Sequence, residues 1–147
     1  MISNSVIQAD LIASLKGNGT LTARLERNDG SGGAESVKES QYAGTTFTYP
    51  AVRVRVNRQI PRTEAGPCDI ARLSFSIRVL TEGGSSKDAD EIAAIVNNHF
   101  HGDGGGRKFQ GAGWSTFLRS SGLDSALRTG ERAWMAIANF EGTVYPA

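Results

Sequence analysis

The strongest constraint on the fold is a segment in which valine and arginine alternate, Val52-Arg53-Val54-Arg55-Val56. Successive side chains of a β-strand point to opposite faces of a sheet. The valines therefore face one way, and Arg53 and Arg55 face the other. The pattern predicts a strand over residues 47–59 whose one face packs on a core. The other face carries guanidinium groups into water, a partner or a charged lumen.

A second segment, residues 70–81, has the cleanest two-residue period in the chain, with Leu73, Phe75, Ile77 and Val79 on the inward side. Arg72 and Arg78 fall on the outward side, so they can share one sheet face with the arginines of the first strand. A solvated face and a subunit or nucleic-acid surface are both open interpretations of these arginines. The outward positions are Arg and Ser, and an RNA-binding sheet needs exposed aromatic rings for stacking, which disfavours RNA.

Two helices are predicted by apolar stripes and capping residues. Residues 5–16 carry an i, i+4, i+8 stripe, with Ser5 as the cap and Gln8 as its capping-box partner. Residues 86–101 have Ser85 or Ser86 as the cap and carry acidic residues in the first turn, where the helix dipole favours anions.

The other segments are assigned by weaker patterns. Residues 20–27 predict a short strand, residues 28–40 a flexible loop, and residues 111–120 and 132–144 two further strands. The apolar run 133–138 suggests a strand covered on both faces, either inside the subunit or between subunits, with Trp134 as a core or interface anchor.

The order helix-strand-strand-helix-strand-strand predicts one α+β domain over residues 1–147. We expect two layers, with a mostly antiparallel sheet of about four strands and two helices on one face.

Composition disfavours several classes of protein. Sixteen Lys and Arg against fifteen Asp and Glu argue against a dedicated nucleic-acid binder, whose domain is usually clearly basic. Cys68 is the only cysteine, so no intrachain disulfide forms. The chain shows neither a signal peptide nor an apolar run long enough to span a bilayer, so we expect a soluble protein made without export.

No segment carries a catalytic, cofactor-binding or metal-binding signature. His99 and His101 are two residues apart on a predicted helix and cannot share a metal, so hydrogen-bonding or cationic roles at the helix end are favoured. The stretch from Gly102 to Lys108 lacks the ending of a phosphate loop, although its basic pair Arg107 and Lys108 can touch an acidic neighbour. A small enzyme built around His99, Cys68 or acidic residues is the least favoured hypothesis.

Several blocks resemble the tail-terminator, or tail-completion, proteins of long-tailed bacteriophages. The likeness extends over about residues 5–145 and is carried by Gln41–Val54, Leu73–Ile77, Ser85–Ala93, Phe117–Ser120, and Trp134 with Phe140–Val144. It implies a ring-forming α+β subunit, usually of a hexamer. The ring caps the tail tube, ends its growth and joins it to the head connector.

This resemblance further implies a structural virion protein of the neck, made in the host cytoplasm, with no cofactor, no membrane contact and no enzymatic activity. Its partners are other copies of itself, the tail tube protein and the head connector or stopper protein, and DNA passes through the lumen without sequence-specific binding. The candidate interface or lumen residues are Arg53, Arg55, Arg72, Arg78, Arg107, Lys108 and Trp134. Replacing Arg53 and Arg55 together by Glu should then disturb assembly more than folding. A head-completion or connector-stopper protein and, less favoured, a small nucleic-acid-binding α+β domain are the alternatives.

Overall fold

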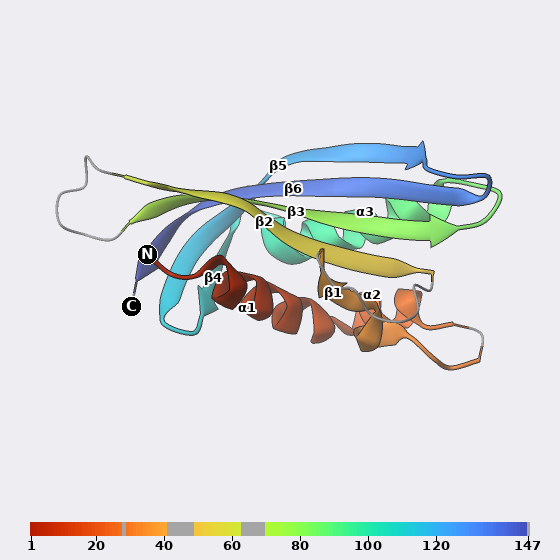
Figure 1. The fold of residues 1–147 in the computed structure, drawn as a ribbon, viewed down its shortest axis with the longest axis horizontal. Coiled ribbons are helices and arrows are strands. Elements are labelled where there is room, and N and C mark those ends of the chain that lie inside the picture. The colour runs from red at the N-terminus through yellow and green to blue at the C-terminus, as the bar shows by residue number, and fades with distance from the viewer. Residues whose placement is uncertain (28, 41–48, 63–69, 147) are drawn as a thin grey trace.

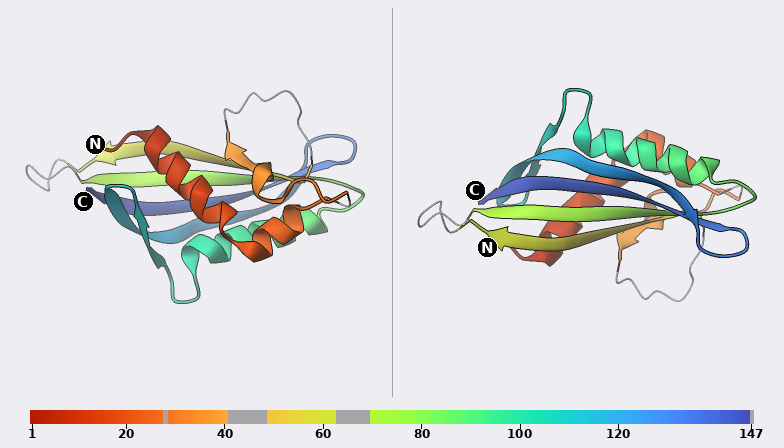
Figure 2. Two further views of the ribbon diagram at one scale, coloured as in Figure 1. Left: turned by 90° about the horizontal axis from the view of Figure 1, so that it is seen from below. Right: turned by 90° about the horizontal axis from the view of Figure 1, so that it is seen from above.

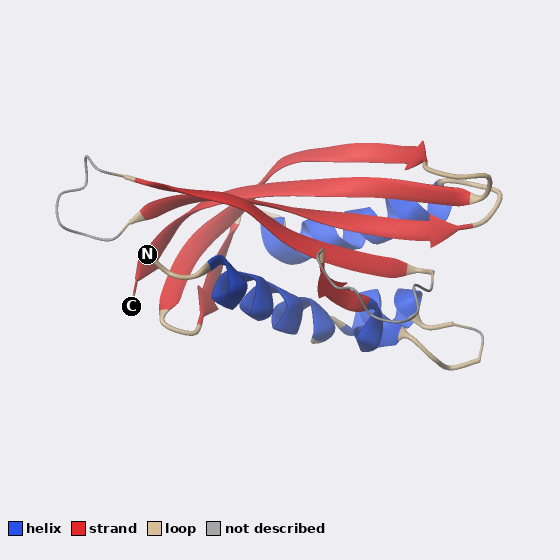
Figure 3. Ribbon diagram, viewed as in Figure 1, coloured by secondary structure: helices blue, strands red, loops and turns tan. Residues whose placement is uncertain are grey.

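The computed structural model describes residues 1–27, 29–40, 49–62 and 70–146, which form two layers (Figure 1). One layer is a sheet with strand order β1-β2-β3-β6-β5-β4, in which β1 runs parallel to β2 and all other neighbours are antiparallel. The other layer consists of helices that lie on one side of this sheet (Figure 3). The elements are α1 (Asn4–Lys16), α2 (Gly19–Leu25), the 3₁₀ helix η1 (Gly33–Ser36), β1 (Val37–Glu39), β2 (Ala51–Pro61), β3 (Ala71–Glu82), α3 (Lys87–His101), β4 (Arg107–Gly111), β5 (Trp114–Arg128) and β6 (Ala133–Pro146).

The core lies between the two layers and is organised around three aromatic rings. Phe75 of β3 stacks on Phe140 of β6 with a centroid distance of 5.1 Å, and Phe100 of α3 meets Phe75 edge-on at 5.6 Å. All three side chains are buried. The inward residues predicted for β3 are all buried too, so the two-residue period of that strand is confirmed.

The two predicted helices are confirmed, with differences at their caps. Ser3, rather than Ser5, caps α1 by accepting the Ser5 N–H at 3.3 Å. Gln8 does not complete a capping box, because its Oε1 accepts the Val56 N–H of β2 at 2.9 Å. Helix α3 begins one residue later than predicted and ends at Gly102, whose φ of +69° is costly for other residues.

The strand predicted at residues 20–27 is wrong, because this segment forms α2. The Oδ1 atom of Asn18 accepts the Leu21 N–H at 3.1 Å and caps the helix. Leu21 and Leu25 are buried one turn apart, and this i, i+4 spacing outweighs the weak alternation in the sequence.

The predicted loop at residues 28–40 contains regular structure. Residues 33–36 form η1, and residues 37–39 form β1, which pairs with β2 through Val37↔Val52. Val37 is fully buried, and burial of this aliphatic side chain ties the segment to the core.

The sheet has six strands among the described residues, not the predicted four. Besides β1, the sequence interpretation missed β4, and it ended β5 at residue 120 although β5 continues to Arg128. Within the described residues of one chain, strand β6 is covered on the helix side only, so cover inside the subunit is not found, whereas cover between subunits stays a prediction. Ala136 and Ala138 are buried on the helix side, whereas Met135 and Ile137 are half-buried on the other. Three sequence features lie outside the described residues: the first part of the predicted strand (47–48), the block 41–48 of the phage resemblance, and Cys68.

The sheet has long open edges, on which side chains from the helices accept three backbone hydrogen bonds. β1 covers only Val52–Val54 of β2, and β4 covers only Trp114–Leu118 of β5. On the part of β2 that β1 leaves open, Gln8 accepts the Val56 N–H. On the part of β5 that β4 leaves open, the Nδ1 of His101 accepts the Ser120 N–H at 2.9 Å, and Asp90 accepts the Ala126 N–H at 2.8 Å. These contacts occupy backbone donors that an incoming strand would otherwise use.

Candidate functional site

The side of the sheet opposite the helices, which we call the outer face, has no described element covering it (Figure 2). In an antiparallel pair, directly opposed residues share a face. The strand registers therefore define the rows of side chains across the outer face. These rows are Leu80–Met135–Leu127, Arg53–Arg78–Ile137–Asp124, Arg55–Ser76–Asn139, Arg58–Ser74–Glu141–Arg119, and Ile60–Arg72–Thr143.

The outer face does carry the four arginines predicted for it, but they form two groups. Arg53 and Arg78 are directly opposed, and Arg55 lies two residues further along β2. Arg72 lies six residues from Arg78 on β3, toward the other end of the sheet. The prediction of a shared face is thus confirmed, whereas a single arginine cluster is not formed.

The three grouped arginines differ in their bonding. Arg53 is half-buried, and its Nη1 donates to the Ser36 carbonyl at 3.0 Å, which fastens η1 to the sheet. Within the described part of the chain, the side chains of Arg55 and Arg78 have no hydrogen bond or ion pair. Arg55 and Arg78 are therefore available for a partner, while Arg53 has a structural role.

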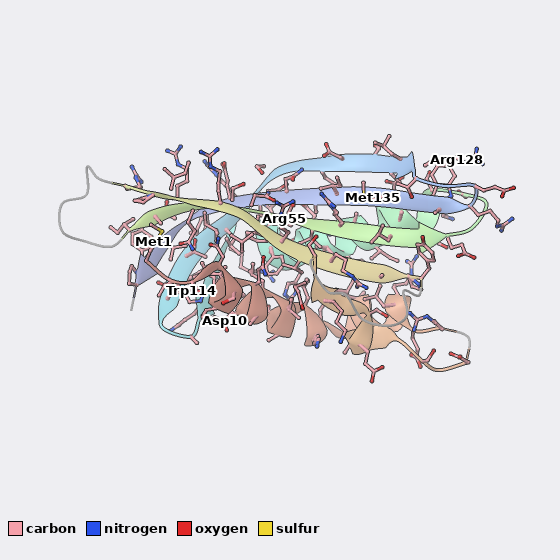
Figure 4. The ribbon with its side chains drawn as sticks, viewed as in Figure 1. Met1, Asp10, Arg55, Trp114, Arg128 and Met135 are labelled. Carbon is pink, nitrogen blue, oxygen red and sulfur yellow. The ribbon has the colours of Figure 1, made fainter. Side chains whose placement is uncertain are left out.

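Apolar side chains lie beside these arginines. Leu80, Met135 and Ile137 are half-buried on the outer face, and Leu127 in the same area is 67% exposed. Figure 4 shows Arg55 and Met135 on neighbouring parts of this surface. We call the set Arg55, Arg78, Leu80, Leu127, Met135 and Ile137 the central patch. Its combination of Met, aliphatic residues and Arg is typical of the core of protein–protein interfaces.

The other predicted interface residues lie elsewhere. Trp134 points to the helix side, packs on the core and donates from Nε1 to the Gly83 carbonyl at 3.0 Å. Arg107 donates from Nη1 to the His99 carbonyl at 2.9 Å, and Lys108 is exposed on β4 opposite Phe117. The structure therefore does not join these three residues to the central patch.

Sequence reasoning missed the aromatic residues of the outer face. Phe117 on β5 and Tyr145 on β6 are 55% and 48% exposed. Both lie toward the Arg72 end of the sheet. The alternation Trp114, Thr116, Leu118, all buried, places Phe117 outward and could have revealed it.

Comparison with known proteins supports this arrangement of layers. The chain has the fold of a virion component. A solved structure described as the virion of a native gene transfer agent particle contains a chain that matches it with a TM-score of 0.67 and 17% sequence identity, over 96% of both chains. No protein-family model matches the sequence, and no curated protein sequence matches it. At this identity the likeness establishes a shared fold.

On the helix side of the sheet, His99 takes part in a polar network between α1, α2 and α3. Its Nε2 lies 2.8 Å from Ser14 Oγ, and its Nδ1 lies 3.0 Å from Asn18 Nδ2. Because Asn18 Oδ1 accepts the Leu21 N–H, its Nδ2 donates to His99 Nδ1. The neutral imidazole then carries its hydrogen on Nε2 and donates it to Ser14. This Ser–His pair has the wrong tautomer for His99 to deprotonate the serine.

The hydrogen-bonding roles expected for the two histidines are confirmed, whereas a cationic role for His99 is not. Burial, with a smaller contribution from the positive charge of Arg107, lowers the pKa of His99 below its ordinary value of 6.5. The described residues contain no group of three or more His, Cys, Asp or Glu side chains placed to hold a metal ion. They also include no helix of the length and apolarity needed to cross a bilayer.

The lowered pKa of His99 predicts an acid-sensitive fold. Between the folded pKa and the ordinary value of 6.5, the unfolded chain binds a proton that the folded chain does not. The stabilising contribution of neutral His99 is therefore complete above pH 6.5 and decreases as pH falls through this window. Urea unfolding at pH 7.5 and 5.5 should show a smaller decrease in unfolding free energy for His99→Gln than for the wild type. Equal decreases would contradict this role.

Proposed function

We propose that this protein is a structural virion subunit that assembles into a ring, caps the tail tube, ends its growth and joins the tube to the head connector. The observation that carries the proposal is the fold likeness over 96% of both chains to a component of a gene transfer agent virion. The proposal of the tail terminus, in particular, rests on the blocks that resemble tail-terminator proteins. The proposed role needs no cofactor and no chemistry, and DNA would pass through the lumen of the ring.

The central patch is the proposed contact between subunits. A closed ring uses a heterologous interface, in which two different patches of each subunit meet. Partly exposed apolar side chains beside arginines that make no hydrogen bond or ion pair within the described residues are typical of such surfaces. Because helix side chains occupy three backbone donors on the open edges of β2 and β5, we infer that subunits meet through the face of the sheet rather than by adding strands.

Electron microscopy tests the proposal directly. Negatively stained purified protein should show rings, alone or after mixing with tail tubes of its own phage, and the rings should sit at one end of each tube. Adding the purified protein while tail tubes are growing should give shorter tubes. Failure to bind tubes under all of these conditions would overturn the tail-terminator role. Binding to the connector in the absence of tubes would instead indicate a connector-stopper protein.

A further inference from the structure

A groove crosses the outer face at the end distant from the central patch. It has a volume of about 520 Å³ and is lined by side chains from β3, β5 and β6 and by Arg62, just after β2. The lining side chains that matter here are Arg62, Arg72, Arg119, Glu141, Phe117 and Tyr145. Pockets of roughly 300–1,000 Å³ hold drug-sized ligands, which are about as large as a few amino-acid residues.

The groove has a surplus of positive charge. Arg119 donates from Nε to Glu141 at 2.9 Å, so one cation of the groove is neutralised. In the part of the chain that the structure describes, Arg62 and Arg72 make no side-chain hydrogen bond or ion pair. Among the described residues, these two guanidinium groups thus have no anionic partner, and each is able to bind a carboxylate through two parallel hydrogen bonds.

Aromatic rings complete the groove. Phe117 and Tyr145 expose about half of their surfaces, although rings of this size are normally covered. Tyr, Phe and Arg are enriched at the centres of protein–protein interfaces. The groove therefore combines anion recognition with a surface for an apolar side chain.

The charges favour a peptide over a nucleic acid. A protein that binds the DNA backbone through about six to ten phosphate contacts shows a steep dependence of affinity on salt. Within the described residues, this groove offers only two guanidinium groups that have no ion pair, Arg62 and Arg72. Two or three carboxylates on a short segment match the available charge.

We propose that the groove is a docking site for a short acidic segment of a partner protein, with carboxylates bound by Arg62 and Arg72 and an apolar side chain packed on Phe117 and Tyr145. The site is separate from the central patch and does not depend on ring formation.

The experiment uses a fluorescein-labelled ten-residue peptide of alternating aspartate and leucine, with binding followed by fluorescence anisotropy at low salt. The wild type should bind this peptide and should not bind a matched peptide with lysine in place of aspartate. Because each guanidinium contributes charge-assisted hydrogen bonds, Arg72→Glu and Arg62→Glu should each weaken binding about tenfold or more. Arg72→Gln gives a second, milder variant if Arg72→Glu fails to fold.

Arg55→Glu is the matched control, because it makes the same charge change on the same face outside the groove. It should leave peptide binding unchanged, while Arg72→Glu should leave ring formation unchanged. Equal weakening by Arg55→Glu and Arg72→Glu, or no weakening by either groove variant, would overturn the proposal. Tighter binding of a ten-nucleotide single-stranded DNA than of the acidic peptide, lost in Arg72→Glu, would also overturn it and assign the groove to nucleic acid.

Discussion

Replacing Arg55 and Arg78 together by Glu should abolish ring assembly while leaving the fold intact. Both side chains lie in the central patch, and within the described residues neither has a hydrogen bond or ion pair to lose. Reversing two charges at a desolvated contact costs several kcal/mol, so we expect self-association to weaken at least about a hundredfold. Sedimentation velocity would report the loss of the ring, and circular dichroism with urea unfolding would report the fold.

Two control variants distinguish the effect of changing a charge from the effect of changing the central patch. Lys16→Glu changes a charge on the helix side and should leave the ring intact. Leu127→Ser removes an apolar side chain that is 67% exposed and should weaken the ring without any change of charge. A ring that survives the double arginine variant would contradict the assignment of the central patch.

The structure changes which two arginines should be mutated to test assembly, because the sequence alone suggested Arg53 and Arg55. Arg53 and Arg55 look equivalent in the alternating segment, but Arg53 donates to the Ser36 carbonyl and holds η1 against the sheet. Its replacement by Glu would therefore disturb the fold and assembly together. Arg78, directly opposite Arg53, lies 25 positions away from it in the chain, and only the strand register shows that it belongs with Arg55.

The variant Asp10→Ala should show the largest loss of stability among the polar contacts. Asp10 Oδ2 accepts the indole N–H of Trp114 at 2.7 Å and the Ala112 N–H at 2.9 Å, so it ties α1 to the β4–β5 turn (Figure 4). Trp114 is fully buried, and the variant leaves its N–H without an acceptor. Losing two hydrogen bonds to a charged group costs about 2–4 kcal/mol, which urea unfolding would measure.

A double-mutant cycle with Trp114→Phe isolates the indole contribution. The phenylalanine ring has no N–H to leave unsatisfied, so Asp10→Ala should cost less in the Trp114→Phe background than in the wild type. Equal costs in both backgrounds would show that the indole bond contributes nothing. Asp10→Asn retains an acceptor oxygen and should fall between Asp10→Ala and the wild type.

The parts of the fold that the sequence predicts are those in which local pattern and burial agree. Strand β3 and helix α3 carry strong periods, and their buried residues match them. Segments with a weak period misled the interpretation. Leu21 and Leu25 form one buried turn of α2, while β4 contains a single partly buried aromatic residue, Phe109, after a glycine-rich turn. Such short elements are held by tertiary contacts that the local sequence does not display.

The candidate site was predictable only in part, because it too depends on tertiary contacts that the local sequence does not show. Alternation placed Arg53, Arg55, Arg72 and Arg78 on one face, but their division into two groups follows from strand order and register. The groove draws on residues from five separate segments, including Gly105 of the turn before β4, and these segments extend from Arg62 to Tyr145 in the chain. Asp10 and Trp114 are 104 positions apart, and no local pattern connects them.

The side chains that occupy the open edges of β2 and β5 also bear on how large an assembly can become. An edge strand with unpaired backbone groups can pair with a strand of another chain, which then offers the same edge to a further chain. An assembly that grows in this way has no fixed number of chains. Here Gln8, Asp90 and His101 use up edge donors, and the outermost strands, β1 and β4, are only three and five residues long. Copies that join through faces meet at a fixed angle, and they form a ring where that rotation closes and a helical filament where it does not. The helix side chains thus act against one kind of fibre, the kind that grows by adding strands to the edge of a sheet.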